Sequence, residues 1–144
     1  MEATKQIELY NVPPILIFCF QRFKSHGMYF KEKMEDTVDF PIENLDMTDF
    51  VVSEEQKQQH SPLLYDLYAV SNHYGSLAFG HYTAFCKNNG VWYDFNDSSV
   101  NECMSSDSVV TGAAYVLYYK RKDFFPEGPI DFQQIRIKPD FSTE

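Results

Sequence analysis

Two polar residues of the segment 71–101, His81 and Asn96, have side chains suited to acid–base chemistry. A histidine ring held by an amide or carboxylate oxygen has a fixed tautomer, and its other nitrogen is free to take a proton from a thiol. Asp97 directly follows Asn96 and is a second candidate for the orienting oxygen. The segment therefore offers the base and the orienter that a thiol nucleophile requires.

A hairpin is predicted to position these residues. The dipeptide Asn89-Gly90 favours the two-residue turn that joins antiparallel strands. Residues 82–88 and 91–95 flank it, and both runs are short, contain aromatic side chains and lack proline, as the arms of a hairpin do.

The turn also sets the register of the two arms. Counting outward from it places Thr83 opposite Asn96 and His81 opposite Ser98. Because side chains alternate between the two faces of a strand, His81 and Asn96 share a face as diagonal neighbours, roughly 7 to 8 Å apart at the backbone. An asparagine oxygen can bridge that distance to an imidazole N–H. Asp97 points to the other face and needs a bulge to compete.

A thiol nucleophile is not evident in the sequence. Cys19, Cys86 and Cys103 are the only cysteines, and none begins a helix after a glycine-rich turn, where the helix dipole would lower a thiol pKa. Cys86 belongs to the predicted hairpin but lies on the face opposite His81. All three cysteines are interpreted as small buried hydrophobic residues.

Several ordered blocks of the sequence resemble the ubiquitin-specific proteases. The histidine box of that family is similar to GHYTAF, WYDFNDSSV and AAYVLYY at residues 80–85, 92–100 and 113–119. Upstream blocks that resemble the family in the same order are residues 13–17, 21–23, 39–41 and 65–70. So many blocks with compatible spacing make a far stronger signal than a lone GHY.

The resemblance implies an α+β fold, the mostly antiparallel β-sheet half of a papain-like cysteine protease with few short helices. Residues 3–122 are expected to form this carboxyl-terminal half of the catalytic domain, and residues 123–144 a loosely docked or disordered tail. The implied activity is that of a cysteine-type deubiquitinase, which cleaves the bond after the terminal glycine of ubiquitin.

Roles for single residues also follow from the resemblance. His81 is the implied general base and Asn96 the third member of the triad, while Asp97 supports the site or shares the orienting role. Gly80 and Tyr82 are implied substrate-binding residues. His73 lines the channel for the ubiquitin tail in this interpretation, and the alternative is a surface loop histidine.

The sequence departs from the family pattern in two respects. The loop 74–80 is glycine-rich in relatives, whereas here Leu77 and Phe79 add bulk, and they either face outward or narrow the channel. The family's cysteine box and paired CxxC motifs have no counterpart. We therefore expect a fragment, a truncated gene model or one partner of a split domain, with an apolar face left for the missing amino-terminal half. Alternatives are an inactive ubiquitin-binding or regulatory fragment and a purely structural β domain.

Composition restricts the partners. A net charge of −9 and a pI near 4.8 argue against nucleic acid and anionic membranes, and favour protein partners, here ubiquitin and ubiquitinated proteins. The histidines and cysteines lack the spacing of a metal site, so neither metal nor cofactor is predicted. An odd number of cysteines without a secretory signal predicts a cytoplasmic or nuclear protein.

Further elements follow from local patterns. Apolar, β-prone runs predict strands at residues 7–10, 15–23, 63–71 and 113–120. Residues 48–60 are polar and predict a surface loop with a short helix, and a brief helical turn is predicted after Ser105.

Overall fold

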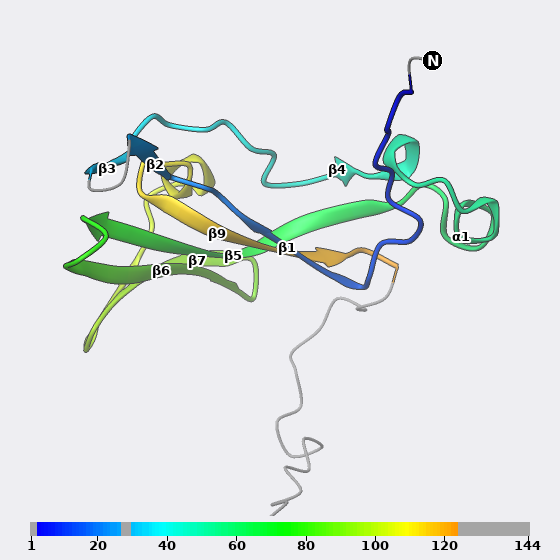
Figure 1. The fold of residues 1–144 in the computed structure, drawn as a ribbon. Coiled ribbons are helices and arrows are strands. Elements are labelled where there is room, and N and C mark those ends of the chain that lie inside the picture. The colour runs from blue at the N-terminus through cyan, green and yellow to red at the C-terminus, as the bar shows by residue number, and fades with distance from the viewer. Residues whose placement is uncertain (1–2, 27–29, 124–144) are drawn as a thin grey trace, which may run out of the picture.

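The computed structural model describes residues 3–26 and 30–123. Within them the chain forms nine strands, one α-helix and two 3-10 helices (Figure 1). The elements are β1 (Ile15–Cys19), β2 (Phe23–His26), β3 (Phe30–Lys33), β4 (Leu45–Asp46), η1 (Thr48–Phe50), α1 (Glu54–His60), β5 (Leu64–Gly75), β6 (Gly80–Asn88), β7 (Val91–Asn96), β8 (Ser99–Glu102), η2 (Ser106–Val109) and β9 (Ala114–Arg121).

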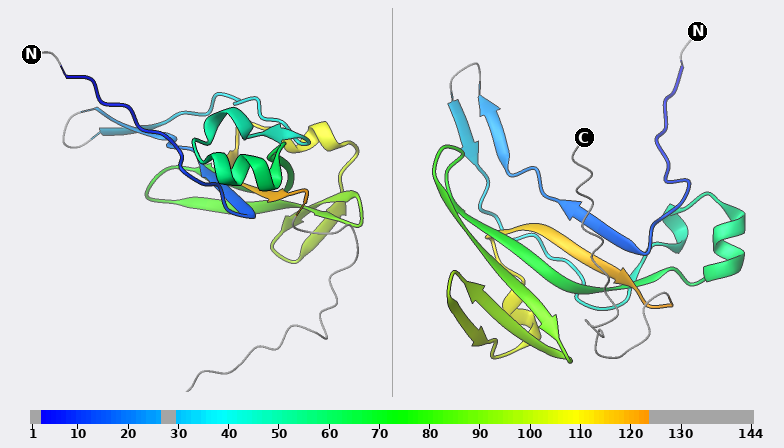
Figure 2. Two further views of the ribbon diagram at one scale, coloured as in Figure 1. Left: turned by 90° about the vertical axis from the view of Figure 1, so that its right-hand side faces the viewer. Right: turned by 90° about the horizontal axis from the view of Figure 1, so that it is seen from below.

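An antiparallel sheet organises the fold. Its strands lie in the order β1-β9-β5-β6-β7-β8, and β4 pairs with the beginning of β5. The hairpin β2–β3, the connection to β4 and the helices lie on one side of this sheet (Figures 1 and 2). The mostly antiparallel architecture predicted from the sequence is confirmed.

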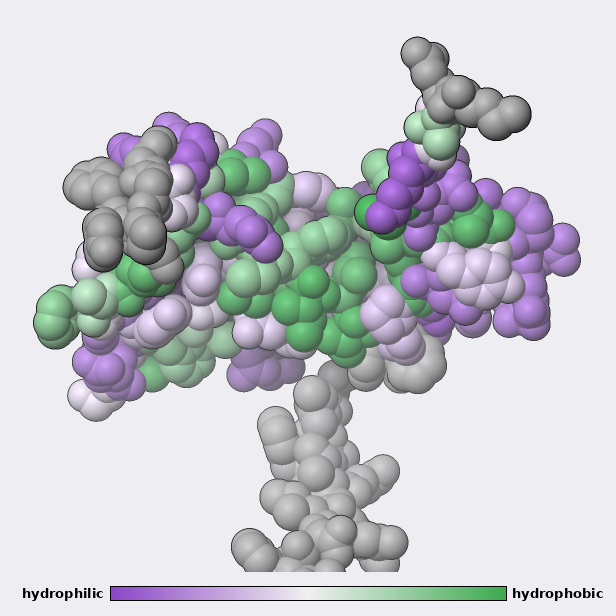
Figure 3. All heavy atoms as spheres, viewed as in Figure 1, coloured by the Kyte–Doolittle hydropathy of each residue, from purple (hydrophilic) through white to green (hydrophobic). Residues whose placement is uncertain are grey.

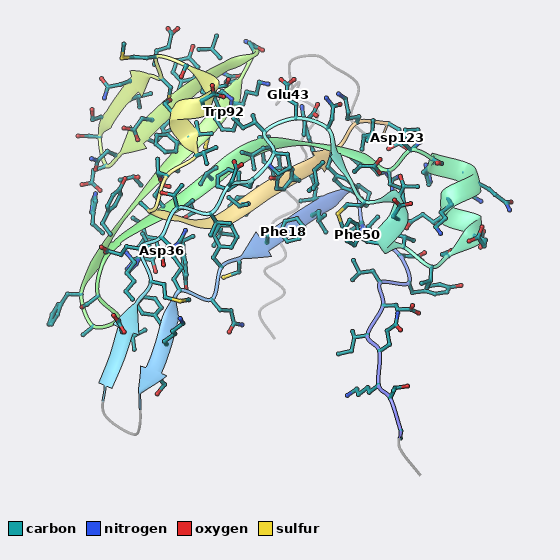
Figure 4. The ribbon with its side chains drawn as sticks, turned by 90° about the horizontal axis from the view of Figure 1, so that it is seen from above. Phe18, Asp36, Glu43, Phe50, Trp92 and Asp123 are labelled. Carbon is teal, nitrogen blue, oxygen red and sulfur yellow. The ribbon has the colours of Figure 1, made fainter. Side chains whose placement is uncertain are left out.

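The covered face of the sheet carries the hydrophobic core. Leu67, Val70, Trp92, Leu117 and Tyr119 point from the strands into it. Side chains from the covering segments complete the cluster, namely Val12, Phe40, Met47, Val51, Leu63 and Val109. Figure 4 looks onto this face and labels Trp92 at one end and Phe18 on β1. Each large apolar side chain buried here contributes about 1.5–3 kcal/mol of transfer free energy.

The opposite face of the sheet is apolar but uncovered by the described residues. One row across it, in register, is Ile17, Tyr118, Ala69, Cys86, Tyr93 and Glu102. The neighbouring row is Cys19, Val116, Ser71, Ala84, Phe95 and Val100. A sheet face in water is ordinarily polar, so an apolar face of this kind indicates a contact surface.

Two predicted strands differ from the structure. Residues 7–10 form no strand, because only an isolated bridge joins Leu9 to Val51 and Ile7 remains exposed. The run 15–23 divides into β1 and the start of β2. The division falls at buried Arg22, whose guanidinium donates to the backbone carbonyls of Ala114, Met34 and Asp36.

The other predicted elements agree with the structure. Residues 63–71 and 113–120 lie largely within β5 and β9. The polar segment 48–60 contains η1 and α1, and the hydroxyl of Ser53 caps α1 by accepting from the Gln56 backbone N–H at 3.3 Å. The helical turn after Ser105 is η2. The predicted tail, 123–144, lies outside the described residues beyond Asp123.

Replacing Arg22 is expected to destabilise the fold. Arg22→Met leaves one buried and two part-buried carbonyl acceptors without their charged donor, so the free energy of unfolding should fall by about 3 kcal/mol or more, as measured by urea denaturation. Lys24→Met, at an exposed position of β2, is the matched control and should change it little. Equal losses in the two variants would contradict this role of Arg22.

Candidate active site

The turn between β7 and β8 fixes the position of Asn96. Asn96 pairs with Ser99, and Asp97 between them adopts a left-handed backbone with φ of 50°. Aspartate tolerates this conformation better than most residues do. Asn96 is therefore the last residue of its strand, with its side chain on the same face as that of His81, and Asp97 is in the turn.

The predicted hairpin register is confirmed where the two arms pair. Asn88 lies opposite Val91 and Phe85 opposite Asp94, around the turn at Asn89-Gly90. The ladder ends one residue early, since its last pair is Ala84 with Phe95 and Asn96 pairs only with Ser99 of β8. The expected ladder pair of Thr83 with Asn96 is therefore absent from the described register.

His81 and Asn96 are joined by a hydrogen bond. The Nε2 atom of His81 lies 2.7 Å from the Oδ1 atom of Asn96. An amide oxygen can only accept, so Nε2 carries the proton and donates it. In the neutral ring Nδ1 then holds a lone pair, which is the atom a general base uses. Both residues are exposed, so this nitrogen is accessible.

His73 is buried beside this pair. The residue is 4% exposed, and its ring centroid lies 4.8 Å from that of Tyr82, 5.7 Å from that of Tyr115 and 5.8 Å from that of Phe23. The alternative of a surface loop histidine is therefore wrong. Burial lowers the pKa of the His73 imidazole, and the ammonium of Lys33, which donates to the His73 backbone carbonyl at 2.6 Å, lowers it further.

Gly80 is required by its close approach to His73. A Cβ atom at position 80 would meet the Nε2 atom of His73 and lie 2.9 Å from the backbone oxygen of Tyr74. Glycine therefore allows β6 to begin directly against the buried ring, one residue before His81. The ring of Tyr82 also packs against that of His73, and Tyr82 itself remains exposed.

The loop between β5 and β6 is tightly closed. The Ser76 hydroxyl accepts from the Phe79 backbone N–H at 3.3 Å, and the Ser76 N–H donates to the Phe79 carbonyl at 2.7 Å. Leu77 and Phe79 are 55% and 84% exposed. Whether they face outward or narrow the channel for the ubiquitin tail stays a prediction.

The cysteines provide no nucleophile to His81. Cys86 lies on the uncovered face, opposite the face of His81, and burial raises the pKa of its thiol. Cys19 is exposed, and Cys86 and Cys103 are partly buried, so the prediction of three buried cysteines is wrong for Cys19 and only partly right for the others. Cys19 lies near the edge of the sheet because β1 is its outermost strand.

Among residues 3–26 and 30–123, no cluster of three or more histidine, cysteine, aspartate or glutamate side chains is arranged to hold a metal ion. No helix described there has the length and apolar character needed to cross a membrane.

Sequence reasoning missed β8 and the reversal that precedes it. The signal was present in Asn96, Asp97, Ser98 and Ser99, which are typical turn residues. A two-residue turn at this point would have predicted β8 and the placement of Asp97 in the turn.

Comparison with known proteins identifies the class. The family model described as ubiquitin carboxyl-terminal hydrolase matches residues 2–119. Ubiquitin carboxyl-terminal hydrolase 15 of Homo sapiens is 47% identical over 126 residues, which cover 86% of this chain and 12% of the relative. Ubiquitin carboxyl-terminal hydrolase 4 of Mus musculus is 47% identical over 124 residues, covering 85% and 12%.

Solved structures show the same relationship. The SAGA Ubp8/Sgf11/Sus1/Sgf73 DUB module bound to ubiquitin aldehyde matches with a TM-score of 0.70 and 30% identity, over 81% of this chain and 26% of that one. A second structure of the SAGA Ubp8/Sgf11/Sus1/Sgf73 DUB module matches with a TM-score of 0.69 at the same identity. The chain thus spans about a quarter of the solved relatives and about an eighth of the curated ones.

The fold defines the class, because the antiparallel sheet matches part of the solved DUB modules at 30% identity. The extent of the family match makes the assignment specific, and the chain belongs to the ubiquitin carboxyl-terminal hydrolase family, among the ubiquitin-specific proteases.

Gly80→Ala tests the contact with His73. The added methyl group forces the ring or the backbone to shift, so the free energy of unfolding should fall by about 1–3 kcal/mol in urea denaturation. In a His73→Ala background the same substitution should cost clearly less, because the ring is gone. Equal costs in both backgrounds would contradict the proposed contact.

The lowered pKa of His73 predicts acid sensitivity. The buried ring takes up a proton less readily than in the unfolded chain, whose reference pKa is 6.5. The associated stability is therefore complete above that pH and is lost as the pH falls toward the lower folded pKa. In urea denaturation from pH 7.5 to 5, His73→Gln should reduce this pH dependence. An unchanged dependence would contradict the assignment.

Proposed function

We propose that this chain supplies the general base and the orienter of a cysteine-type deubiquitinase, His81 and Asn96. The observation that carries the proposal is the 2.7 Å hydrogen bond, which protonates Nε2 and frees Nδ1. The substrate class is a protein joined to the terminal glycine of ubiquitin by an isopeptide or peptide bond. The solved relatives bound to ubiquitin and ubiquitin aldehyde support ubiquitin as the partner.

The geometry suits both halves of acyl transfer. Nδ1 of His81 takes the proton of a thiol, and the thiolate attacks the carbonyl carbon of the terminal glycine. The imidazolium then gives its Nδ1 proton to the departing amine, which leaves a thioester. Water hydrolyses this thioester after losing a proton to Nδ1, which restores the thiol. Throughout, Asn96 holds the Nε2 proton and keeps the ring in place.

The thiol in this scheme comes from another polypeptide segment, since no described cysteine reaches His81. We assign it to the missing amino-terminal half of the catalytic domain, whether in a longer form of the same protein or in a separate chain. The exposure of His81 and Asn96 supports this assignment, because the pair is open to a second segment on their own side of the sheet.

His73, Gly80 and Tyr82 are proposed to serve the substrate tail. Tyr82 is exposed and its ring packs at a tilt against buried His73, which fixes the ring one residue after His81 on β6. Because Gly80 has no side chain, the backbone of β6 can lie directly against the His73 ring, one residue before the base. We also propose a cytoplasmic or nuclear location and, given the net charge of −9, no nucleic acid or membrane partner.

A second candidate is an inactive ubiquitin-binding or regulatory fragment. The described cysteines favour it for the chain acting alone, because none is available to His81. Labelling by a ubiquitin probe with a cysteine-trapping warhead distinguishes the hydrolase from the inactive fragment. A labelled species in extract that contains this chain's peptides supports the hydrolase, and ubiquitin binding without labelling supports the fragment.

Asn96→Ala is expected to slow catalysis by the complete enzyme. Without the amide oxygen the ring loses its fixed tautomer, so kcat on a ubiquitin substrate should fall by about 100-fold with KM little changed. Asn101→Ala, an exposed asparagine on neighbouring β8, is the matched control and should leave kcat unchanged. An unaffected kcat in Asn96→Ala would contradict the proposed role.

A further inference from the structure

The sheet has two open edges that differ in character. The edge strands are β1 and β8, at the two ends of the strand order. An open edge presents unpaired N–H and C=O groups that can pair with another chain, and proteins usually protect it with charge, short length, proline or a bulge. β8 is four residues long and polar, ending in Asn101 and Glu102, so it is protected.

β1 has none of these protections within its length. Its residues Ile15–Cys19 read ILIFC, five apolar residues without a charge or a proline. Its pairing with β9 is continuous over all five, with no bulge. It is therefore an uncharged apolar edge, preceded by Pro13 and Pro14, in a protein with a net charge of −9.

The outward backbone groups of β1 can be assigned. The Phe20 N–H donates to the Tyr115 carbonyl at 2.9 Å, and the Arg121 N–H donates to the Pro14 carbonyl at 2.8 Å. Even-numbered residues therefore face β9, and by alternation Ile15, Ile17 and Cys19 direct their N–H and C=O groups outward. Among the described residues no strand pairs with this side, and Figure 2 shows β1 at the margin of the sheet.

The side chains of the same three residues lie on the uncovered face. Ile17 is 56% exposed, and Cys19 is also exposed. Figure 3 shows hydrophobic residues gathered in the middle of the molecule, where Figure 1 places β1. The open backbone edge and the exposed apolar row therefore coincide.

We propose that β1 pairs antiparallel with β1 of a second copy of this chain, about a two-fold axis at Ile17. Ile17 then lies opposite Ile17 of the second copy, and Ile15 lies opposite Cys19. All three outward residues of each strand meet outward residues of the other, so their N–H and C=O groups pair across the axis. The strand is self-complementary, which a two-fold interface requires.

Charge permits this arrangement despite the net charge of −9. Neither β1 nor β9, the two strands nearest the axis, carries a carboxylate. Lys120 pairs with Ile15 at one end of β1, so antiparallel pairing places the two copies of Lys120 at opposite ends of the interface. The acidic residues responsible for the net charge belong to other segments.

The dimer leaves the proposed site accessible. His81 is on β6, which is separated from β1 by β9 and β5, and its ring faces the opposite side from Ile17. The inference stands on the edge of the sheet alone and does not rest on the proposed function.

Matched substitutions at the two edges test the proposal. Ile17→Lys places a charge on the axis, and Val100→Lys places one on β8, where the side chain is 54% exposed on the same face. Sedimentation equilibrium of the full chain should show a dimer in the wild type and in Val100→Lys. Ile17→Lys should weaken the dimer at least tenfold. Circular dichroism should confirm that both variants are folded.

Amide hydrogen exchange provides the second measurement. The amides of Ile15, Ile17 and Cys19 should exchange more slowly as the protein concentration rises, in step with dimer formation. A monomer at all concentrations overturns the proposal, whether these amides are open or are protected by another part of the same chain. A dimer that survives Ile17→Lys also overturns it, because the interface then lies elsewhere.

Discussion

The hydrogen bond between His81 and Asn96 is the interaction on which the chemical interpretation of this structure depends. It decides which ring nitrogen carries the proton and which is free, and no other described contact does so. The bond joins residues on two strands, so it exists only while β6 and β7 keep their register. The turn at Asn89-Gly90 sets that register, and the reversal at Asp97 ends β7 where Asn96 can still reach the ring.

The packing behind the base restricts it further. Buried His73 is enclosed by aromatic rings and leaves space for no side chain at Gly80, so β6 begins against a rigid surface. The strand that carries the exposed base is therefore positioned by buried side chains. Catalytic groups need positions that are fixed by packing in this way. The rest of the described chain is one large sheet covered on one face, with an apolar second face and an apolar edge, together with the two-stranded sheet β2–β3.

The sequence predicted the features that depend on local interactions, and it did not predict those that depend on segments distant in sequence. The hairpin, its register and the face shared by His81 and Asn96 were predictable, because a two-residue turn allows one register. The prediction of a strand at 7–10 was wrong, since a sequence with β propensity forms a strand only where a neighbouring strand is available. Burial of His73 and exposure of Cys19 depend on segments distant in sequence, such as Lys33 and the place of β1 at the sheet edge.

The most direct measurement is the tautomer of His81, read from long-range ¹⁵N–¹H correlations of its ring in the isotopically labelled chain. The structure predicts that the neutral ring is protonated on Nε2, with a bare Nδ1, and that this preference disappears when Asn96 is replaced by alanine. A ring protonated on Nδ1, or one indifferent to that replacement, would contradict the assignment of His81 as an oriented general base.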